Sequence, residues 1–382
     1  MKYLFVARGP GETGQARALA KYTSKKEEEI LFALHQEKNL HFLSTDKEFK
    51  VFLTETPEKL KKIIEEKKPE VLLLFNSKMW GNYPEFYENT FPKPPLAIGI
   101  DSNWLFNNKR YSKYKFIEWL DKYLVLFPEK IFNLGLKENG GDFFVPKKIL
   151  RKIIPVGFIP SYQKPSRKTA PEIKEKYKIK REEKFIFSYF GGLGAGHRVF
   201  AFNNLISAVD GLVKKERKIK VLYIGPTDNL DPKKLKKGWL LKKDSLPADE
   251  YFLTLAQADL VFQHQGMVTL AQAISGRVPV ICNVHILEDE PLRKLHFWEV
   301  LPFKRAGVCE MFSKSTKISK IAKTIDELLF NTKKRKEMQK KQKLLWENGE
   351  EKAFKIIKKL LKENRRDKSL LPLRSAVAEL DK

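Results

Sequence analysis

The segment that most strongly suggests chemistry lies between residues 258 and 280, where an apolar run meets a polar turn and a helix start. A glycine in such a turn lets the backbone approach a ligand, and the amide groups at a helix start attract anions. We therefore expect this corner to bind a phosphate or a ribose, with His264, Gln265 and Gly266 as candidate ligand residues.

Two glycine-rich loops each follow a short apolar run and precede a helical pattern. The first loop, Arg8–Gly14, follows Tyr3–Ala7, and the second, Gly191–Gly196, follows the run from Phe185. Such a loop can hold a phosphate, although taken alone it is equally a tight turn. The candidate ligand residues are Gly11, Thr13 and Gly14 in the first loop, and Gly191, Gly192, Gly194 and the adjoining His197 in the second.

Two carboxylates follow predicted strands in the first half of the chain. Glu12 lies in the first glycine loop, and Asp101 directly follows the apolar run Leu96–Ile100. A carboxylate within reach of a hydroxyl can accept its proton as a general base. Glu12 is our first candidate for this role and Asp101 the second. No group of His, Cys, Asp or Glu has the spacing of a metal site, so we expect no metal.

The elements that position these residues are short, unalternating apolar runs separated by helical patterns, which is typical of parallel strands covered on both faces. Such runs occur on either side of a Lys-, Pro- and Glu-rich stretch with little apolar content. The sequence thus predicts an α/β protein with two doubly wound, Rossmann-like domains. The expected bounds are 1–157 for the first domain, 158–184 for a linker, 185–345 for the second domain and 346–382 for a C-terminal helix and tail.

Composition limits the partners and the compartment. The formal net charge of +27 favours polyanions or an anionic bilayer, although lysines that stand beside glutamates on helices are equally a solvated surface. No run approaches the roughly 18 apolar residues of a membrane span, and no signal-peptide cleavage site follows the N-terminus. Cys282 and Cys309 both lie in apolar segments, as core residues of a reducing compartment do. We therefore expect a cytoplasmic protein.

The corner at residues 258–280 also resembles a known signature. It is similar to the donor-site signature of GT-B glycosyltransferases in the order of three motifs. These are ADLV, then a helix start of the form polar-Gly-x-x-Thr-Leu, then Val278-Pro279-Val280. Downstream, His296–Gly307 resembles the donor-sugar region of the peptidoglycan lipid-intermediate N-acetylglucosaminyltransferase family, with its W-x-x-L-P-x-x-x-A-G spacing. The two glycine loops resemble those of the same family. The resemblance adds four expected donor-binding residues: Thr269, Gln272, Glu290 and His296.

Three positions depart from that family's pattern. Gln272 stands where the family has a ribose-binding glutamate; an amide still hydrogen-bonds to hydroxyls, but the identity of the nucleotide is less secure. The family has a glycine directly before its Val-Pro pair. In this chain the glycine stands one position earlier, at Gly276, and Arg277 occupies the position that the glycine has in the family. Glu12 or, one register along, Thr13 replaces the histidine of the first loop, which leaves the general base open.

The resemblance implies the GT-B architecture, with two Rossmann-like domains facing a central cleft. It implies an inverting transfer of a sugar from a nucleotide diphosphate sugar, with UDP as the expected nucleotide, to a hydroxyl acceptor. The nucleotide sugar is then a substrate, and no cofactor is expected. The acceptor would be a glycan, a lipid-linked sugar or a small molecule. For a lipid-linked acceptor the protein would work at the inner face of the membrane, with the aromatic and basic segment Trp104–Lys115 as its docking surface.

Two functions of other classes remain open. A sugar-nucleotide epimerase on the same fold would release nucleotide without any acceptor. A non-catalytic protein that binds polyanions or a membrane surface would use the fold as a scaffold. Nucleic acid is not an expected partner, because the sequence carries no recognised nucleic-acid module.

Overall fold

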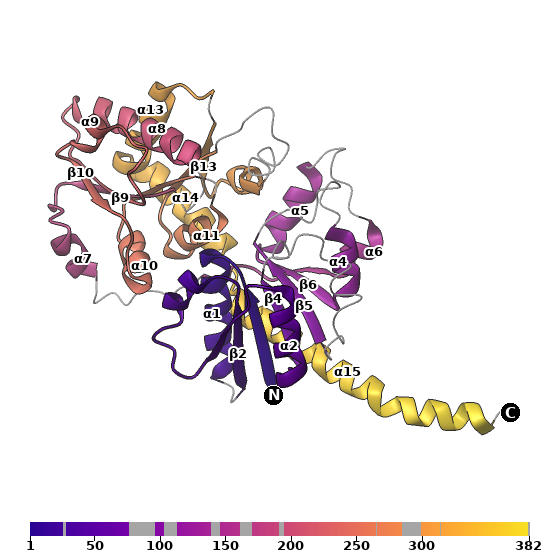
Figure 1. Ribbon diagram of the computed structural model, residues 1–382. Helices are drawn as coiled ribbons and strands as arrows, with labels where there is room; N and C mark the ends of the chain where they lie inside the picture. The colour runs from indigo at the N-terminus through magenta and orange to yellow at the C-terminus, as the bar shows by residue number, and fades with distance from the viewer. Residues whose placement is uncertain are drawn as a thin grey trace. The chain divides into compact units, whose positions relative to one another are not determined.

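The computed structural model describes residues 1–25, 28–75, 96–102, 113–138, 146–160, 170–190, 195–264, 266–284, 299–313 and 315–380. The chain forms two compact units (Figure 1). The first comprises Met1–Glu129, Gly141–Ser161 and Glu347–Lys382, and the second comprises Lys130–Gly140 and Tyr162–Trp346. Each unit is built on one parallel sheet.

The first unit contains a seven-stranded sheet in the order β3-β2-β1-β4-β5-β6-β7. Its strands are β1 (Lys2–Ala7), β2 (Glu29–Leu34), β3 (Lys50–Leu53), β4 (Val71–Phe75), β5 (Leu96–Asp101), β6 (Lys122–Val125) and β7 (Ile153–Pro155). Its helices are α1 (Pro10–Ser24), η1 (Glu37–Phe42), α2 (Pro57–Lys67), α4 (Lys113–Trp119) and α6 (Lys147–Leu150), whereas α5 (Glu129–Glu138) lies in the second unit apart from its first residue. The apolar runs of the sequence become these central strands because β1, β4 and β5 are buried on both faces.

The chain winds outwards from β1 through β2 to β3 and then returns to β4 on the other side of β1. The direction of winding therefore reverses between β1 and β4. Parallel α/β sheets bind their ligands outside the carboxyl ends of the strands at such a switch point. Residues 8–14 directly follow β1, so the first unit presents them at this position.

The C-terminal helix α15 (Gly349–Leu380) belongs to the first unit, where it packs beside α1 (Figure 1). Ala353, Ile357 and Leu361 are buried in the core that also contains Leu19 and Phe5. The helix is entered at Gly349, whose amide donates to the carbonyl of Phe158. A tail that is remote in sequence thereby completes the core of the N-terminal sheet.

The second unit repeats the same winding with six parallel strands in the order β10-β9-β8-β11-β12-β13. Its strands are β8 (Lys184–Tyr189), β9 (Ile219–Ile224), β10 (Leu240–Lys243), β11 (Leu260–Gln263), β12 (Val280–Asn283) and β13 (Glu310–Phe312). Its helices are α7 (Ala170–Lys176), α8 (Ala195–Val213), α9 (Pro232–Leu235), α10 (Ala248–Ala256), α11 (Met267–Gly276), α13 (Ile318–Phe330) and α14 (Thr332–Leu345), with a further helical stretch over 299–305. The switch point of this sheet lies between β8 and β11.

The two doubly wound parallel sheets confirm the predicted α/β fold class. The sequence patterns did not identify the edge strands β3, β7, β10 and β13. Lys242 and Lys243 are exposed on β10, so this strand lacks the continuous apolar run of a central strand. Within the described ranges, no helix is long and apolar enough to cross a membrane, and no group of three or more His, Cys, Asp or Glu could hold a metal ion.

Candidate functional site

The switch point of the second sheet lies at the predicted donor corner. His264 and Gly266 follow β11, which pairs with β8. Open α/β sheets bind ligands outside the carboxyl ends of the strands at such a switch point. His264 and Gly266 therefore lie where this fold binds a ligand.

Within the described residues, the helix α11 starts without a side-chain cap. Its N-cap residue is Gly266, with φ −66° and ψ 114°, angles that suit any residue, so the backbone conformation does not require glycine there. A Cβ on Gly266 would lie 3.1 Å from Cε1 of His264, a tight contact that would require the histidine ring to shift by a few tenths of an ångström. The amides of such a helix start attract an anion.

Three polar side-chain atoms near this corner are buried without a hydrogen-bond partner among the described residues. They are Oε1 of Gln263 at the end of β11, Oε1 of Gln272 on α11 and Nδ2 of Asn283 at the end of β12. Their residues are 0%, 2% and 0% exposed. A buried polar group left unsatisfied costs about 1–3 kcal/mol. Three such atoms on neighbouring elements are explained if a ligand with several hydroxyl, amide or phosphate groups completes their bonding.

Thr269 has a different environment from the one expected. Its hydroxyl lies 3.1 Å from the hydroxyl of Tyr251 on α10. The ring of Tyr251 in turn packs edge-on against Phe187 and Tyr189 of β8, with ring centroids 5.0 and 5.2 Å apart. The side chain of Thr269 therefore joins α11 to α10, and its hydroxyl keeps further hydrogen-bonding capacity because a hydroxyl has one donor and two acceptor positions.

The other predicted donor residues are divided between described and undescribed parts of the chain. His264 is buried at 5% exposure beside Gly266, and Gln272 is buried on the same helix. His197 lies in the first turn of α8, and its side chain is outside the description. The residues that lie outside the described ranges are Gly191, Gly192, Gly194, Gln265, Glu290 and His296.

In the first unit, the expected loop at Gly11, Thr13 and Gly14 is wrong, because these residues lie in the first turns of α1. Pro10 occupies the first helical position, where its fixed φ suits a helix. The amide and the hydroxyl of Thr13 both donate to the carbonyl of Gly9, at 2.9 and 2.8 Å. These two bonds close the first turn and keep the glycines helical.

Glu12 is the third residue of α1, and its carboxylate folds back over the helix start. A Cβ on Gly9, the N-cap residue, would collide with Oε2 of Glu12. A glutamate at this position commonly reaches back towards the N-cap and interacts favourably with the helix dipole. Glu12 is half-buried, so it also remains within reach of solvent at the carboxyl end of β1.

Asp101, the second candidate base, is enclosed at the end of β5. It is 3% exposed, and its Oδ2 accepts a hydrogen bond of 2.9 Å from the hydroxyl of Tyr123 on β6. Gly99 stands opposite Tyr123 in the register and makes room for it, because a Cβ there would lie 2.6 Å from the tyrosine ring. This geometry favours an anchoring role for Asp101 and leaves Glu12 as the more accessible carboxylate.

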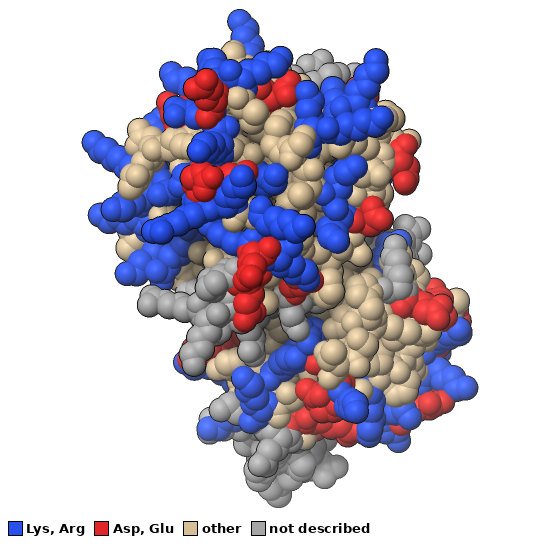
Figure 2. All heavy atoms as spheres, turned by 90° about the vertical axis from the view of Figure 1, so that its left-hand side faces the viewer, with Lys and Arg blue, Asp and Glu red and all other residues tan. Residues whose placement is uncertain are grey.

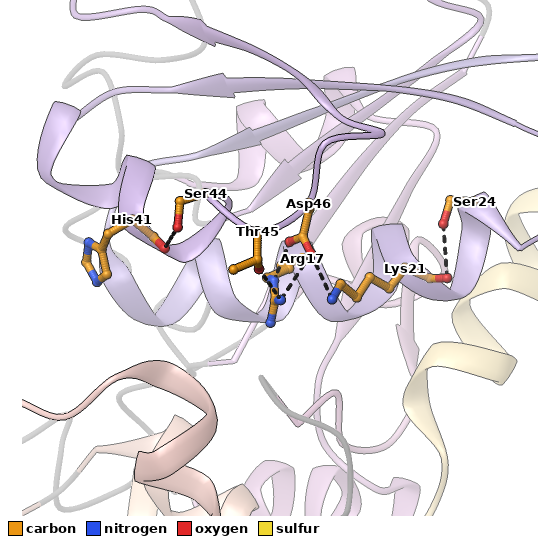
Figure 3. Close-up of polar contacts among 7 residues, drawn as sticks. All are labelled: Arg17, Lys21, Ser24, His41, Ser44, Thr45 and Asp46. Carbon is orange, nitrogen blue, oxygen red and sulfur yellow. Dashed lines mark hydrogen bonds and ion pairs between the residues drawn. The ribbon is translucent and has the colours of Figure 1, made fainter.

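Sequence reasoning did not identify an ionic cluster on α1, which Figure 3 shows. Asp46 binds Arg17 through Nε at 2.5 Å and Nη2 at 3.1 Å, and it binds Nζ of Lys21 at 2.8 Å. Burial alone would raise the pKa of Asp46, but the hydrogen bonds from Arg17 and Lys21 outweigh it and hold this pKa below its usual value. The cluster joins the segment after η1 to α1. The partners lie 29 residues apart, and no local pattern announces them.

The predicted docking segment Trp104–Lys115 lies largely outside the described residues. Residues 103–112 lie outside the described part of the chain, and residues 113–115 belong to α4 with side chains outside the description. Cys282 and Cys309 are described, and both are free and buried.

No protein-family profile matches the sequence, and no curated protein sequence matches it. Solved structures match nearly the whole chain. The S. aureus MnaA–UDP co-structure has a TM-score of 0.69 at 14% identity, over 95% of this chain and 97% of that chain. A Listeria monocytogenes structure assigned as UDP-N-acetylglucosamine 2-epimerase has a TM-score of 0.58 at 15% identity, over 89% and 90%. Acinetobacter baumannii MurG has a TM-score of 0.59 at 12% identity, over 94% and 100%.

Identities this low establish a common fold and leave the activity to be argued from the site. The matches cover both units, and each unit has the doubly wound parallel sheet that the sequence predicted. The chain has the two-domain α/β GT-B fold, which nucleotide-sugar glycosyltransferases share with sugar-nucleotide epimerases.

Proposed function

We propose that this protein is a glycosyltransferase that moves a sugar from a nucleotide diphosphate sugar to a hydroxyl acceptor. The observation that carries the proposal is that Gln263 at the end of β11, Gln272 on α11 and Asn283 at the end of β12 each have a buried polar atom without a hydrogen-bond partner among the described residues, on the elements that form the predicted donor corner. A nucleotide diphosphate offers phosphate oxygens for the helix amides and ribose hydroxyls for side-chain amides. The MnaA structure, which shares the fold, was solved with UDP, and UDP is the nucleotide we propose.

In this proposal the second unit holds the donor and the first unit supplies the base. The first-turn amides of α11 stabilise the negative charge that develops on the leaving diphosphate. The amide of Gln272 hydrogen-bonds to the ribose. Glu12 removes the proton from the acceptor hydroxyl, which then attacks the anomeric carbon directly and inverts its configuration. Nucleotide diphosphate leaves with the electron pair of the broken glycosidic bond.

The test is a thermal-shift screen of the parent protein against UDP-, GDP-, dTDP- and CDP-sugars and the corresponding nucleotides. A ligand that binds only the native state stabilises it by about 2.7 kcal/mol at a concentration of 100 Kd, which raises the melting temperature measurably. We expect the UDP compounds to give the largest shift. If no nucleotide or nucleotide sugar changes the melting temperature, the proposed function is wrong.

The first alternative is a sugar-nucleotide epimerase, which the Listeria monocytogenes match favours. An epimerase would bind the same nucleotide sugars, so binding does not separate the two functions. Incubation of the parent protein with the bound nucleotide sugar and no acceptor does separate them. Formation of an epimeric sugar, or release of nucleotide, without acceptor would favour the epimerase. An unchanged donor that is consumed once an acceptor is added would favour the transferase.

We expect the donor corner to respond to two substitutions. Gln272→Ala removes one neutral hydrogen bond to the ribose and should weaken nucleotide binding about 2–10-fold. Gly266→Val adds a branched side chain where even a Cβ would lie 3.1 Å from His264, and it should weaken binding further. Isothermal titration calorimetry of folded variants measures both effects. Gln272→Glu is the matched control, because a carboxylate also accepts from ribose hydroxyls and should retain binding. Unchanged affinity in both test variants would place the nucleotide elsewhere.

A further part of the proposal concerns the positive charge of the second unit. Lys214–Lys243 contains eleven lysines and arginines and only three acidic residues. Figure 2 shows basic side chains over the face of the molecule on which α9 and β10 lie. We propose that this basic face, rather than a specific nucleic-acid module, attracts an anionic bilayer if the acceptor is lipid-linked. A soluble acceptor would need no such attraction.

Vesicle sedimentation tests this proposal. Each lysine near an anionic leaflet contributes about 1 kcal/mol, so binding should be measurable at low salt and lost at high salt. The test variant replaces four exposed lysines with glutamine: Lys233 of α9, Lys236 directly after α9, and Lys242 and Lys243 of β10. The matched control replaces four exposed lysines of the first unit, Lys47, Lys50, Lys59 and Lys62. Equal recovery with neutral and anionic vesicles, or equal loss in both variants, would contradict a role for this face.

A further inference from the structure

Gln263 is the last residue of β11, and its amide lies between a thiol and the start of α11. Its Nε2 donates to Sγ of Cys282, its register partner on β12, at 3.2 Å. Its Oε1 has no hydrogen-bond partner among the described residues, and the residue is 0% exposed. The same Oε1 lies 3.8 Å from the position of a Cβ on Gly266, the N-cap of α11. The unpartnered oxygen therefore points at the uncapped helix start.

In the orientation that the structure describes, the oxygen of this amide faces the start of α11. The positive end of the helix dipole attracts such an oxygen. A phosphate at the same helix start would be repelled by that oxygen. A half-turn of the amide exchanges oxygen and nitrogen in nearly the same space.

Cys282 permits that exchange because a thiol is both a weak acceptor and a weak donor. In the present orientation its sulfur accepts from Nε2. In the rotated orientation its S–H can donate to Oε1, while Nε2 faces the start of α11. Nε2 then gives up its weak hydrogen bond to Sγ of Cys282 and donates to a charged phosphate oxygen instead. A hydrogen bond to a charged oxygen is the stronger of the two.

We infer that Gln263 is a further donor-binding residue, which rotates its amide on binding and donates from Nε2 to a phosphate oxygen of the nucleotide held at the start of α11. This inference rests on the proposed function, and it concerns a residue that the sequence analysis did not select. Gln263 distinguishes a diphosphate from a nucleoside, whereas Gln272 recognises the ribose that both contain.

The test compares UDP with uridine, by calorimetry, on the parent protein and on Gln263→Met, which has nearly the same shape and no hydrogen-bonding groups. Loss of a hydrogen bond to a charged oxygen should weaken UDP binding about 10–100-fold and leave uridine binding unchanged. Gln263→Glu places a carboxylate beside the phosphate and should weaken UDP binding at least as much. Cys282→Ser should retain UDP binding, because a hydroxyl can also donate to the rotated amide oxygen.

Gln342→Met is the matched control for a glutamine with a structural role. Nε2 of Gln342 donates to the carbonyls of Val278 and Val308, at 2.9 and 3.0 Å, and so joins α14 to the sheet. Its replacement should lower the melting temperature without changing the ratio of UDP to uridine affinity. Gln263→Met should change that ratio.

The outcomes separate the inference from the proposed function. UDP binding by the parent protein with equal losses for UDP and uridine in Gln263→Met would overturn the inference alone. Unchanged affinity for both probes in that variant would also overturn it. If the parent protein binds neither UDP nor any other nucleoside diphosphate of the screen, the proposed function and the inference fail together.

Discussion

Replacement of Asp46 with asparagine is expected to lower the free energy of unfolding by about 3–5 kcal/mol, the usual cost of removing one partner from a buried ion pair. Arg17 would remain buried, with a side chain 9% exposed, and would lose its counter-charge together with Lys21. Urea denaturation followed by circular dichroism measures the change. Lys50→Gln is the matched control, because the pair of Lys50 with Glu29 is exposed and contributes at most about 1 kcal/mol. Equal effects of the two variants would contradict the assigned role.

The effect of Asp46→Asn should also depend on pH. The Arg17 and Lys21 hydrogen bonds outweigh the opposing effect of burial, so the pKa of Asp46 in the folded protein is lowered from 3.8. A lowered folded-state pKa gives stability that is complete above the unfolded-state pKa and is lost as pH falls through the folded-state pKa. The difference in stability between parent and variant should therefore be constant above about pH 5 and narrow below the unfolded-state pKa of roughly 3.9. A difference that widens in acid would contradict this assignment.

Glu12→Gln is expected to reduce turnover by about 10²–10⁴-fold and to leave donor affinity nearly unchanged, because it removes a proton acceptor and keeps the shape of the side chain. The amide can still fold back over Gly9, so α1 should begin as it does in the parent protein. The measurement is the initial rate of sugar transfer with the donor that the thermal-shift screen identifies. Donor affinity, measured separately, shows whether the variant still binds.

Asp101→Asn is the matched comparison for the proposed base. Asp101 is enclosed and accepts a hydrogen bond from Tyr123. Its replacement should therefore lower the melting temperature and have little effect on the rate of transfer. A normal rate in Glu12→Gln combined with a loss of rate in folded Asp101→Asn would transfer the role of base to Asp101. Normal rates in both variants would exclude both carboxylates as the base.

Local sequence patterns determined the central parallel strands. The apolar runs Tyr3–Ala7 and Leu96–Ile100 and the run from Phe185 coincide with β1, β5 and β8, because strands buried on both faces need continuous apolar residues. The turn at Gly266 was identified because a glycine before a helix start is itself a local feature. The fold class followed from the alternation of such runs with helical patterns, which requires no knowledge of which residues touch.

Only the tertiary structure decided the pairings between distant residues. Asp46 meets Arg17 across 29 positions, and Gln263 meets Cys282 across 19. It also decided that the predicted loop at Gly11 and Thr13 is the first turn of a helix, and that α15 returns to the N-terminal core. Periodicity and propensity describe neighbours along the chain, whereas a polar partner depends on strand order, register and packing. The sequence by itself therefore located the turn between β11 and α11, and the packing of the sheets and helices decided which buried polar atoms there lack a partner among the described residues.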